Sequence, residues 1–363
     1  MDDEKRMQKW NKISFTELIS DRTKDGIKLP TNEYNQSGLT AIIDQGQEFI
    51  AGYSDETEGA FTDVPAIIFG DHTRVFKYVD FPFFLGADGV KVLKANQEIN
   101  YKYLYYFFLQ AKFPNTGYAR HFKWLKELQI PLPPLEEQKH IAAVLDKCTA
   151  LIAKHKLMLK KYDTLIKSRF IEMFGDNKYP IISISEMVLG KVPSAKKLFN
   201  KTDEIKYIDI SSVDNKINEI VGYTEYIFEE APSRAQQHIR KNDILISTVR
   251  PNLKNIAINR LDYKEMVASS GFCVLRPKCV PEYLFVAVLQ DKFTSDMVAV
   301  TTGANYPAIK DSDVLNYEIS NPPLELQQQF AAFVQQIDKS KFEIWRYLKF
   351  SDIMNKIGFI LYD

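Results

Sequence analysis

A short proline-rich motif occurs twice in this chain of 363 residues, and its two copies divide the chain into similar halves. The first copy, Pro133-Pro134-Leu135-Glu136-Glu137-Gln138, recurs as Pro322-Pro323-Leu324-Glu325-Leu326-Gln327, which lies 322 − 133 = 189 residues later. At the same shift, Ile141-Ala142-Ala143 becomes Phe330-Ala331-Ala332. An internal repeat of this kind constrains the whole architecture, because each copy should fold into the same structural unit.

Each copy of the motif is a natural helix start. The proline ring presets the backbone angle φ, and its missing N–H group is not needed in the first turn of a helix. The acidic side chains of Glu136, Glu137 and Glu325 then lie near the positive end of the helix dipole. We therefore predict a long helix after each pair of prolines.

The first of these helices is predicted over Leu135 to Phe174, 40 residues in length and roughly 60 Å long if fully helical. Its apolar residues recur every seven positions in two adjacent rows, namely Val144, Leu151, Met158 and Leu165, and Leu145, Ile152, Leu159, Ile166 and Met173. A stripe this wide must pack against another helix. The second helix, from Leu324 to about Ile357, has similar rows. An antiparallel coiled coil of the two helices is the simplest arrangement, and two unrelated amphipathic helices are the alternative.

The segments that precede the helices, 1–132 and 177–321, share one order of parts. Each contains a β-like run that ends in an arginine, Val64 to Arg74 in the first and Asp243 to Arg250 in the second. A second strand, a helical segment and a Gly-containing polar loop follow in both. We therefore predict a mixed α/β (α+β) protein with a pseudo-twofold internal repeat. The predicted divisions are globular domains at 1–134 and 177–323, and helices at 135–176 and 324–363.

This organisation resembles the specificity subunit of type I restriction-modification systems. The strongest part of the likeness is Ile130-Pro131-Leu132-Pro133-Pro134-Leu135-Glu136-Glu137-Gln138 with the helix after it, and the likeness covers essentially the whole chain. The second copy departs from the first in having Leu326 where the first has Glu137. The resemblance implies two target recognition domains held apart by two antiparallel helices, each domain reading one half of a split double-stranded DNA target.

The resemblance also implies partners. The helices would be the docking site for two modification (methyltransferase) subunits, and two restriction (motor-nuclease) subunits can join. The chain itself would then have no cofactor, because S-adenosylmethionine, ATP and magnesium would be used by the partner subunits. A charged amino terminus, the absence of a long apolar run and three scattered cysteines favour a cytoplasmic location.

The charge balance is consistent with such a subunit. Lys+Arg and Asp+Glu both number 47, so the formal net charge is zero. A protein that binds duplex DNA unaided usually has a basic excess, because phosphate neutralisation dominates that affinity. Neutrality therefore argues against a solitary DNA binder and is compatible with one whose partners supply phosphate contacts.

Enzyme signatures are mostly missing from the sequence. Asn321-Pro322-Pro323-Leu324 resembles the Asn-Pro-Pro-aromatic loop of amino-methyltransferases, but Leu324 replaces the aromatic residue and the prolines duplicate a helix start. There is no Gly-x-x-x-x-Gly-Lys-Ser/Thr phosphate loop. The histidines and cysteines do not have zinc-ligand spacing. We predict no catalytic centre and no metal site. Two rival hypotheses stay open, a self-contained DNA methyltransferase and a coiled-coil scaffold without a DNA role.

Candidate DNA-binding residues are polar side chains at strand ends and in Gly-containing loops, where rigid scaffolds usually display binding groups. In the first domain they are His72, Thr73, Arg74, Lys77, Tyr118, Arg120, His121 and Lys123. In the second domain they are Thr248, Arg250, Asn252, Lys254, Thr302, Asn305, Tyr306 and Lys310. The candidate partner-binding residues lie near the helix starts and are Gln138, Lys139, Gln327 and Gln328.

Overall fold

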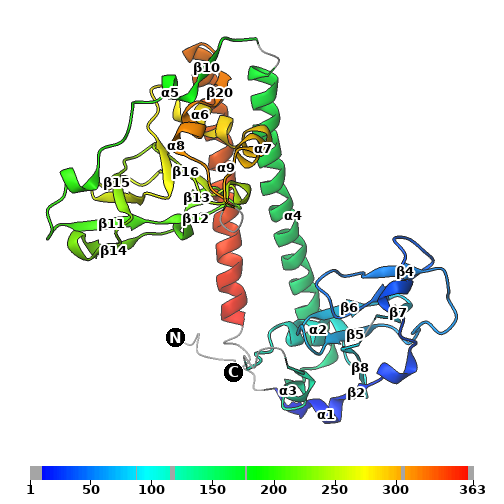
Figure 1. The fold of residues 1–363 in the computed structure, drawn as a ribbon. Helices are drawn as coiled ribbons and strands as arrows, with labels where there is room; N and C mark the ends of the chain where they lie inside the picture. The colour runs from blue at the N-terminus through cyan, green and yellow to red at the C-terminus, as the bar shows by residue number, and fades with distance from the viewer. Residues whose placement is uncertain (1–9, 87, 115–118, 176–177, 304–306, 359–363) are drawn as a thin grey trace. The chain divides into compact units, whose positions relative to one another are not determined.

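The computed structural model describes residues 10–86, 88–114, 119–175, 178–303 and 307–358 (Figure 1). The chain forms two compact units: Met1–His155 with Tyr347–Asp363, and Lys156–Arg346. Each unit contains one globular domain and adjoining parts of the two long helices. The predicted division gave each long helix a segment of its own, whereas the compact units cut across both helices.

The first globular domain contains two small sheets. The first sheet is antiparallel and has the strand order β2-β8-β5-β6. The second has the order β4-β3-β7, with β3 and β7 parallel. The strands are β2 (Ile19–Asp21), β3 (Thr40–Ile43), β4 (Gly52–Ser54), β5 (Ala66–Gly70), β6 (Phe76–Val79), β7 (Phe83–Leu85) and β8 (Val90–Ala95).

The second globular domain repeats most of this topology, without a counterpart of β2 among its described residues and with an additional edge strand, β15. An antiparallel sheet has the order β17-β16-β19, and a second sheet has the order β14-β11-β18-β15, with β11 and β18 parallel. The hairpin β5–β6 therefore corresponds to β16–β17, and the parallel pair β3/β7 corresponds to β11/β18. The strands are β11 (Glu204–Ile208), β14 (Thr224–Ile227), β15 (Ala235–His238), β16 (Ile244–Ser247), β17 (Ile256–Ile258), β18 (Met266–Ser269) and β19 (Phe272–Leu275). The predicted mixed α/β repeat is confirmed.

Each domain is closed by a two-stranded sheet that joins its first and last strands. Strand β1 (Lys12–Ser14) pairs with β9 (Gln129–Pro131), and β10 (Ile181–Ser183) pairs with β20 (Glu318–Ser320). A four-residue helix follows β1 and β10, and in each case a serine precedes it. The Ser14 hydroxyl oxygen accepts from the Glu17 N–H, and the Ser183 N–H and hydroxyl donate to the Glu186 carboxylate, so both serines cap their helices.

Both long helices form where the prolines predict them. Helix α4 spans Leu135–Phe174 and α9 spans Leu324–Gly358. In the second unit, Phe170 of α4 packs on Phe330 of α9 with ring centroids 5.5 Å apart, and Asp163 lies 2.5 Å from Lys341. The residue numbers fall along one helix as they rise along the other, so these segments are antiparallel, as predicted.

The sequence predicts that the whole apolar stripe of the first long helix packs against another helix, and the burial of its two heptad rows corrects this. The row that includes Ile152, Leu159 and Ile166 is buried or half-buried. In the other row, Val144, Leu151 and Leu165 are 45%, 53% and 47% exposed. Packing in the folded chain therefore covers only part of the width of the apolar stripe, and most of the second row is exposed to solvent. None of the described helices combines the length and apolarity needed to cross a membrane.

Near the start of each long helix, one glutamine side chain bonds the helix to the globular domain that precedes it. Gln138 donates from Nε2 to the carbonyl oxygen of Pro133 at 2.8 Å, and its Oε1 accepts from the backbone N–H of Asn100 at 2.9 Å. Gln327 repeats both bonds, with the Pro322 carbonyl at 2.9 Å and the Val280 N–H at 3.1 Å. We call this arrangement the glutamine clamp. It satisfies backbone groups that would otherwise be left without partners beside the helix start.

Two tyrosines reinforce the same junctions. Tyr103 of helix α2 (Tyr101–Leu109) donates its hydroxyl to the Pro131 carbonyl at 2.8 Å. Tyr283 of α6 (Pro281–Val288) donates to the Ser320 carbonyl at 2.5 Å. Both acceptors lie at the end of the closing two-stranded sheet. The second half of the chain therefore reproduces these junction contacts as well as the order of the strands that the two domains share.

Candidate nucleic-acid interface

The turn between β5 and β6 displays one of the predicted arginines. Arg74 is exposed and has a left-handed backbone with φ 62°, a conformation that residues other than glycine adopt rarely. Its N–H donates to the Gly70 carbonyl at 2.8 Å. Beside it, the Thr73 hydroxyl donates to the Gln45 carbonyl at 2.6 Å. The turn is thus held in one shape by bonds to its own sheet and to a neighbouring loop.

The late polar segment of the first domain meets this turn. The His121 N–H donates to the Asp71 carbonyl at 2.8 Å, and the Phe122 N–H donates to the Asp71 carboxylate at 2.7 Å. Two groups of candidates that are about 50 residues apart in the sequence therefore lie side by side. Strand-end turns fixed in this way are the usual place for binding residues.

The second domain repeats the arrangement at its β16–β17 hairpin. Arg250 is exposed and left-handed, with φ 50°, and its N–H donates to the Pro307 carbonyl at 2.8 Å. The Ile309 N–H donates to the Thr248 carbonyl at 2.9 Å. Here the turn continues into a short 3-10 helix, η6 (Pro251–Leu253), on which Asn252 is exposed. We call the two structures the arginine turns.

The candidates differ in how accessible they are. The exposed ones are Thr73, Arg74, Arg120, Lys123, Arg250, Asn252, Thr302 and Lys310. Half-buried ones are His72, Thr248 and Lys254. The Lys254 ammonium forms an ion pair with the Asp291 carboxylate at 2.5 Å, and the Thr248 hydroxyl donates to the Gly271 carbonyl at 3.0 Å. Tyr118, Asn305 and Tyr306 lie outside the described residues.

Two candidates lie inside the first domain and are not placed to contact DNA. Lys77 is 4% exposed, because its side chain points inward from β6 to Asp44 at 3.3 Å and to the Glu48 carbonyl at 2.5 Å. Burial lowers the pKa of Lys77, although the Asp44 carboxylate counteracts this. His121 is 1% exposed, with Nδ1 3.1 Å from the Asp71 carbonyl oxygen. Both side chains hold the fold together.

Two of the four partner-binding candidates also need correction. Gln138 and Gln327 are each 3% exposed, because they form the glutamine clamp, so neither lies on a free helix face. Lys139 and Gln328 are exposed. The Lys139 ammonium pairs with Glu136 at 2.7 Å, one turn away on the same helix.

The sequence that resembles a methyltransferase loop has a structural role. The Pro322 carbonyl accepts from Gln327, and the Asn321 N–H donates to the Pro180 carbonyl at 2.7 Å, so the segment forms the start of α9. Burial raises the pKa of the Cys279 thiol to about 11, which keeps it protonated at neutral pH. No cluster of metal-ligating side chains occurs among the residues that the structure describes.

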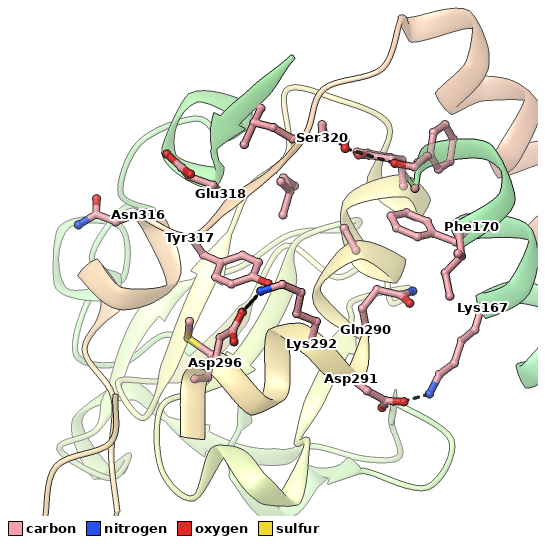
Figure 2. Close-up of a pocket in the computed structure, with 18 of the residues that line it drawn as sticks. Lys167, Phe170, Gln290, Asp291, Lys292, Asp296, Asn316, Tyr317, Glu318 and Ser320 are labelled. Atoms are coloured by element: carbon pink, nitrogen blue, oxygen red, sulfur yellow. Dashed lines mark hydrogen bonds and ion pairs between the residues drawn. The ribbon is translucent and has the colours of Figure 1, made fainter. Parts of the chain in front are cut away.

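A cavity of about 1020 Å³ lies within the second unit, where α4, α6 and α7 (Asp291–Ala299) meet (Figure 2). Apolar side chains such as Phe170 and Tyr283 line it, and Lys292 pairs with Asp296 at its edge at 2.6 Å. None of the DNA-binding candidates within the described residues lines this cavity. The arginine turn lies outside this cavity and is joined to its lining by the ion pair between Lys254 and Asp291.

Comparison with known proteins agrees with this repeated architecture. The family model for the type I restriction modification DNA specificity domain matches twice, at residues 7–161 and 177–349. The chain belongs to this family. Each match covers one globular domain and most of the long helix that follows it, which is the repeating unit found in the structure.

Sequence identity to members that match most of the chain is low. The chain is 23% identical over 338 residues to the type I restriction enzyme EcoR124I/EcoR124II specificity subunit of Escherichia coli, covering 84% of this chain and 81% of that protein. It is 24% identical over 295 residues to the MjaVIII specificity subunit of Methanocaldococcus jannaschii, covering 70% and 69%. A crystal structure of the type I restriction-modification S subunit from M. genitalium superposes with a TM-score of 0.60 at 15% identity, over 100% of this chain and 96% of that one. That likeness supports the fold.

Proposed function

We propose that this specificity-family chain reads a bipartite double-stranded DNA target, one half-site per globular domain. The observation that supports the proposal is the pair of arginine turns. Arg74 and Arg250 occupy corresponding hairpins, share a left-handed backbone and are exposed. Each hairpin is bonded to the late segment of its own domain. Strained backbone held in place by its surroundings is typical of functional sites.

Arginine is suited to this role for a chemical reason. Its guanidinium group can donate two hydrogen bonds to O6 and N7 of guanine in the major groove, and such a pair contributes about 1–3 kcal/mol of discrimination. Exposed polar neighbours such as Thr73 and Asn252 can contact adjacent bases or phosphates. Because the two turns belong to separate domains, each would determine a separate half of the target.

The same proposal assigns the chemistry to partners. Two modification subunits would dock on the long helices, where the row of Val144, Leu151 and Leu165 is exposed, and two restriction subunits would complete the assembly. Exposed apolar rows on helices are typical of protein interfaces. Methyl transfer, ATP hydrolysis and cleavage, with S-adenosylmethionine, ATP and magnesium, would belong to those subunits. This chain would be non-catalytic.

A map of methylated adenines tests the proposal. The chain is co-expressed with its modification subunit, and the methylated sites are located across the host genome. We expect a split motif with a fixed unread gap that disappears when this chain is omitted. Arg74→Ala should relax one half-site and Arg250→Ala the other, each at one or two positions, while the gap stays constant. Exposed Gln236→Ala, in the second domain but not among the candidates, is the control and should leave both half-sites unchanged.

Two outcomes would contradict the proposal. A folded, assembled complex that produces no new methylation would favour a scaffold without a DNA role. Binding of S-adenosylmethionine by the isolated chain, with methylation in the absence of a partner, would favour a self-contained methyltransferase. Isothermal titration of S-adenosylmethionine into the purified chain distinguishes this second case.

A further inference from the structure

The charges of this chain are unevenly distributed along its helices. The whole chain has a net charge of zero, yet residues 147–171 of α4 carry 7 − 1 = 6 excess positive charges. The basic residues of this span are Lys147, Lys154, Lys156, Lys160, Lys161, Lys167 and Arg169. Its one acidic residue, Asp163, is ion-paired with Lys341 of α9 at 2.5 Å. Arg169 pairs with Glu172 of the same helix at 2.8 Å, so only part of the positive charge of this span is neutralised within α4.

Three of these lysines form a row within the second unit. Lys156, Lys160 and Lys167 are four and seven residues apart, a spacing that places them along one face of a helix. Lys156 and Lys160 are exposed, and no ion pair involving either is found among the described residues. We call Lys156, Lys160 and Lys167 the lysine row.

One end of the lysine row adjoins the arginine turn of the second domain. Lys167 lies 3.6 Å from the Asp291 carboxylate, an ion pair drawn in Figure 2. The same carboxylate accepts from Lys254 at 2.5 Å, and Lys254 directly follows η6 in the β16–β17 hairpin. Asp291 therefore links the helix to the hairpin that displays Arg250 and Asn252. Hydrogen bonding by Lys254, with the charge of Lys167, lowers the pKa of Asp291 and keeps this link ionised.

The internal repeat retains part of the row. At the same shift of 189 residues, Lys160 corresponds to Lys349 and Lys167 to Lys356 in α9. Two of the three lysines of the row thus recur in the sequence at the same spacing. A phosphate contact that does not depend on base sequence could therefore be used in both halves of the repeat.

We propose that the lysine row binds backbone phosphates of the DNA next to the half-site read by the second domain. This inference rests on the proposed function and adds a second, sequence-independent contact to it. Lysine binds phosphate as a point charge and gives affinity through the release of condensed counterions. The row would supply, within this chain, positive potential that its zero net charge does not reveal.

The test compares salt dependence in the assembled complex with the modification subunit. The double variant Lys156→Gln/Lys160→Gln and the unchanged chain are titrated with a duplex that holds the methylated motif and with a scrambled duplex, at several salt concentrations. We expect the slope of log K against log salt to become shallower by about 2 for both duplexes, since each lost phosphate contact removes about 0.9. The methylated motif should not change. Exposed Lys339→Gln in α9 is the matched control and should leave the slope unchanged.

Equal slopes for the double variant and the unchanged complex would overturn the inference. So would an altered motif, because that would make the lysines base readers. A third contrary result is loss of the modification subunit on size-exclusion chromatography with DNA affinity preserved per assembled complex, which would assign the row to an acidic protein surface. In all three cases the unchanged complex still methylates a split motif, so the proposed function survives. If the unchanged complex binds neither duplex, the proposed function fails first.

Discussion

The two globular domains carry a basic residue at the same position of corresponding sheets but neutralise it in different ways. Strand pairing aligns Ile67 with Leu93 in the first domain and Ile244 with Leu275 in the second. The next residues along the chain are Lys94 and Arg276. The repeat has thus kept a cation here while changing its identity.

The partners of these two cations differ in exposure. Arg276 makes two hydrogen bonds to Asp243, at 2.9 and 2.7 Å, and the two side chains are 8% and 1% exposed. Lys94 lies 2.8 Å from Asp63, whose side chain is 63% exposed. A buried bidentate pair is destabilised strongly when one partner is removed. A pair whose carboxylate stays in water contributes less, and this is the case for Asp63 although Lys94 is only 12% exposed. The two domains therefore share the strand pairing at this position but differ in the burial of the ion pair that the basic residue forms.

The largest effect should come from breaking the buried pair. Arg276→Leu leaves the Asp243 carboxylate buried without its partner, and we expect a loss of about 3–5 kcal/mol in the stability of the second domain. Asp63→Asn, which removes the partner of Lys94, should cost at most about 1 kcal/mol in the first domain. Hydrogen exchange of amides in β16 and in β5 measures each domain separately. Similar small losses of stability in both domains would show that the Arg276–Asp243 pair stabilises its domain no more than the Lys94–Asp63 pair does.

A smaller effect should be equal in the two domains. Gln138→Leu and Gln327→Leu each remove one glutamine clamp and leave a backbone carbonyl and an N–H without their partner, at a cost of about 1–3 kcal/mol. Denaturant unfolding of each variant measures the loss. Gln328→Leu changes an exposed neighbour of the clamp and should stay within about 0.5 kcal/mol of the unchanged chain. Unequal losses of stability for the Gln138 and Gln327 variants would mean that the two clamps share the same hydrogen bonds but contribute different free energies.

The smallest effect should depend on pH and occur in the first unit alone. Burial raises the pKa of Asp146, but hydrogen bonds from Lys102 and Tyr106 outweigh burial and hold that pKa below its ordinary value. A carboxyl whose folded pKa is depressed stabilises the fold above its unfolded pKa of about 4, and this contribution is lost as the pH falls through the folded value. The position 189 residues later is Gln335, which does not titrate.

We therefore expect Asp146→Asn to reduce stability at pH 7 by less than about 1 kcal/mol, because the side chains of Asp146 and Lys102 are 38% and 42% exposed. The loss should vanish near pH 2. Thermal unfolding of both proteins at pH 7 and pH 2 provides the measurement. A loss of the same size at both pH values would mean that Asp146 acts through packing rather than through its charge.

Much of the architecture was predictable because its signals are local. The proline pairs and the heptad spacing predict a helix over Leu135 to Phe174, and α4 has these bounds. The repeated motif predicts a second unit of the same kind, and the matching sheets confirm it. Helix starts and periodicity depend on neighbours within a few turns of chain, and the repeat is visible as recurring residues, so all three follow from the amino-acid order alone.

Which side chains remain accessible depends instead on contacts made by the folded chain. Lys77 and His121 are typical DNA-contacting residue types, yet contacts with Asp44 and Asp71 bury them. The residues on either side of Gln138 are exposed, but its side-chain oxygen accepts a hydrogen bond from the backbone N–H of Asn100, 38 residues earlier. Accessibility depends on segments that meet through the fold, and a heptad pattern cannot show how much of its stripe a partner helix will cover. For that reason the sequence predicted two helices and two domains correctly, while the structure was needed to separate the exposed arginine turns from the buried clamps.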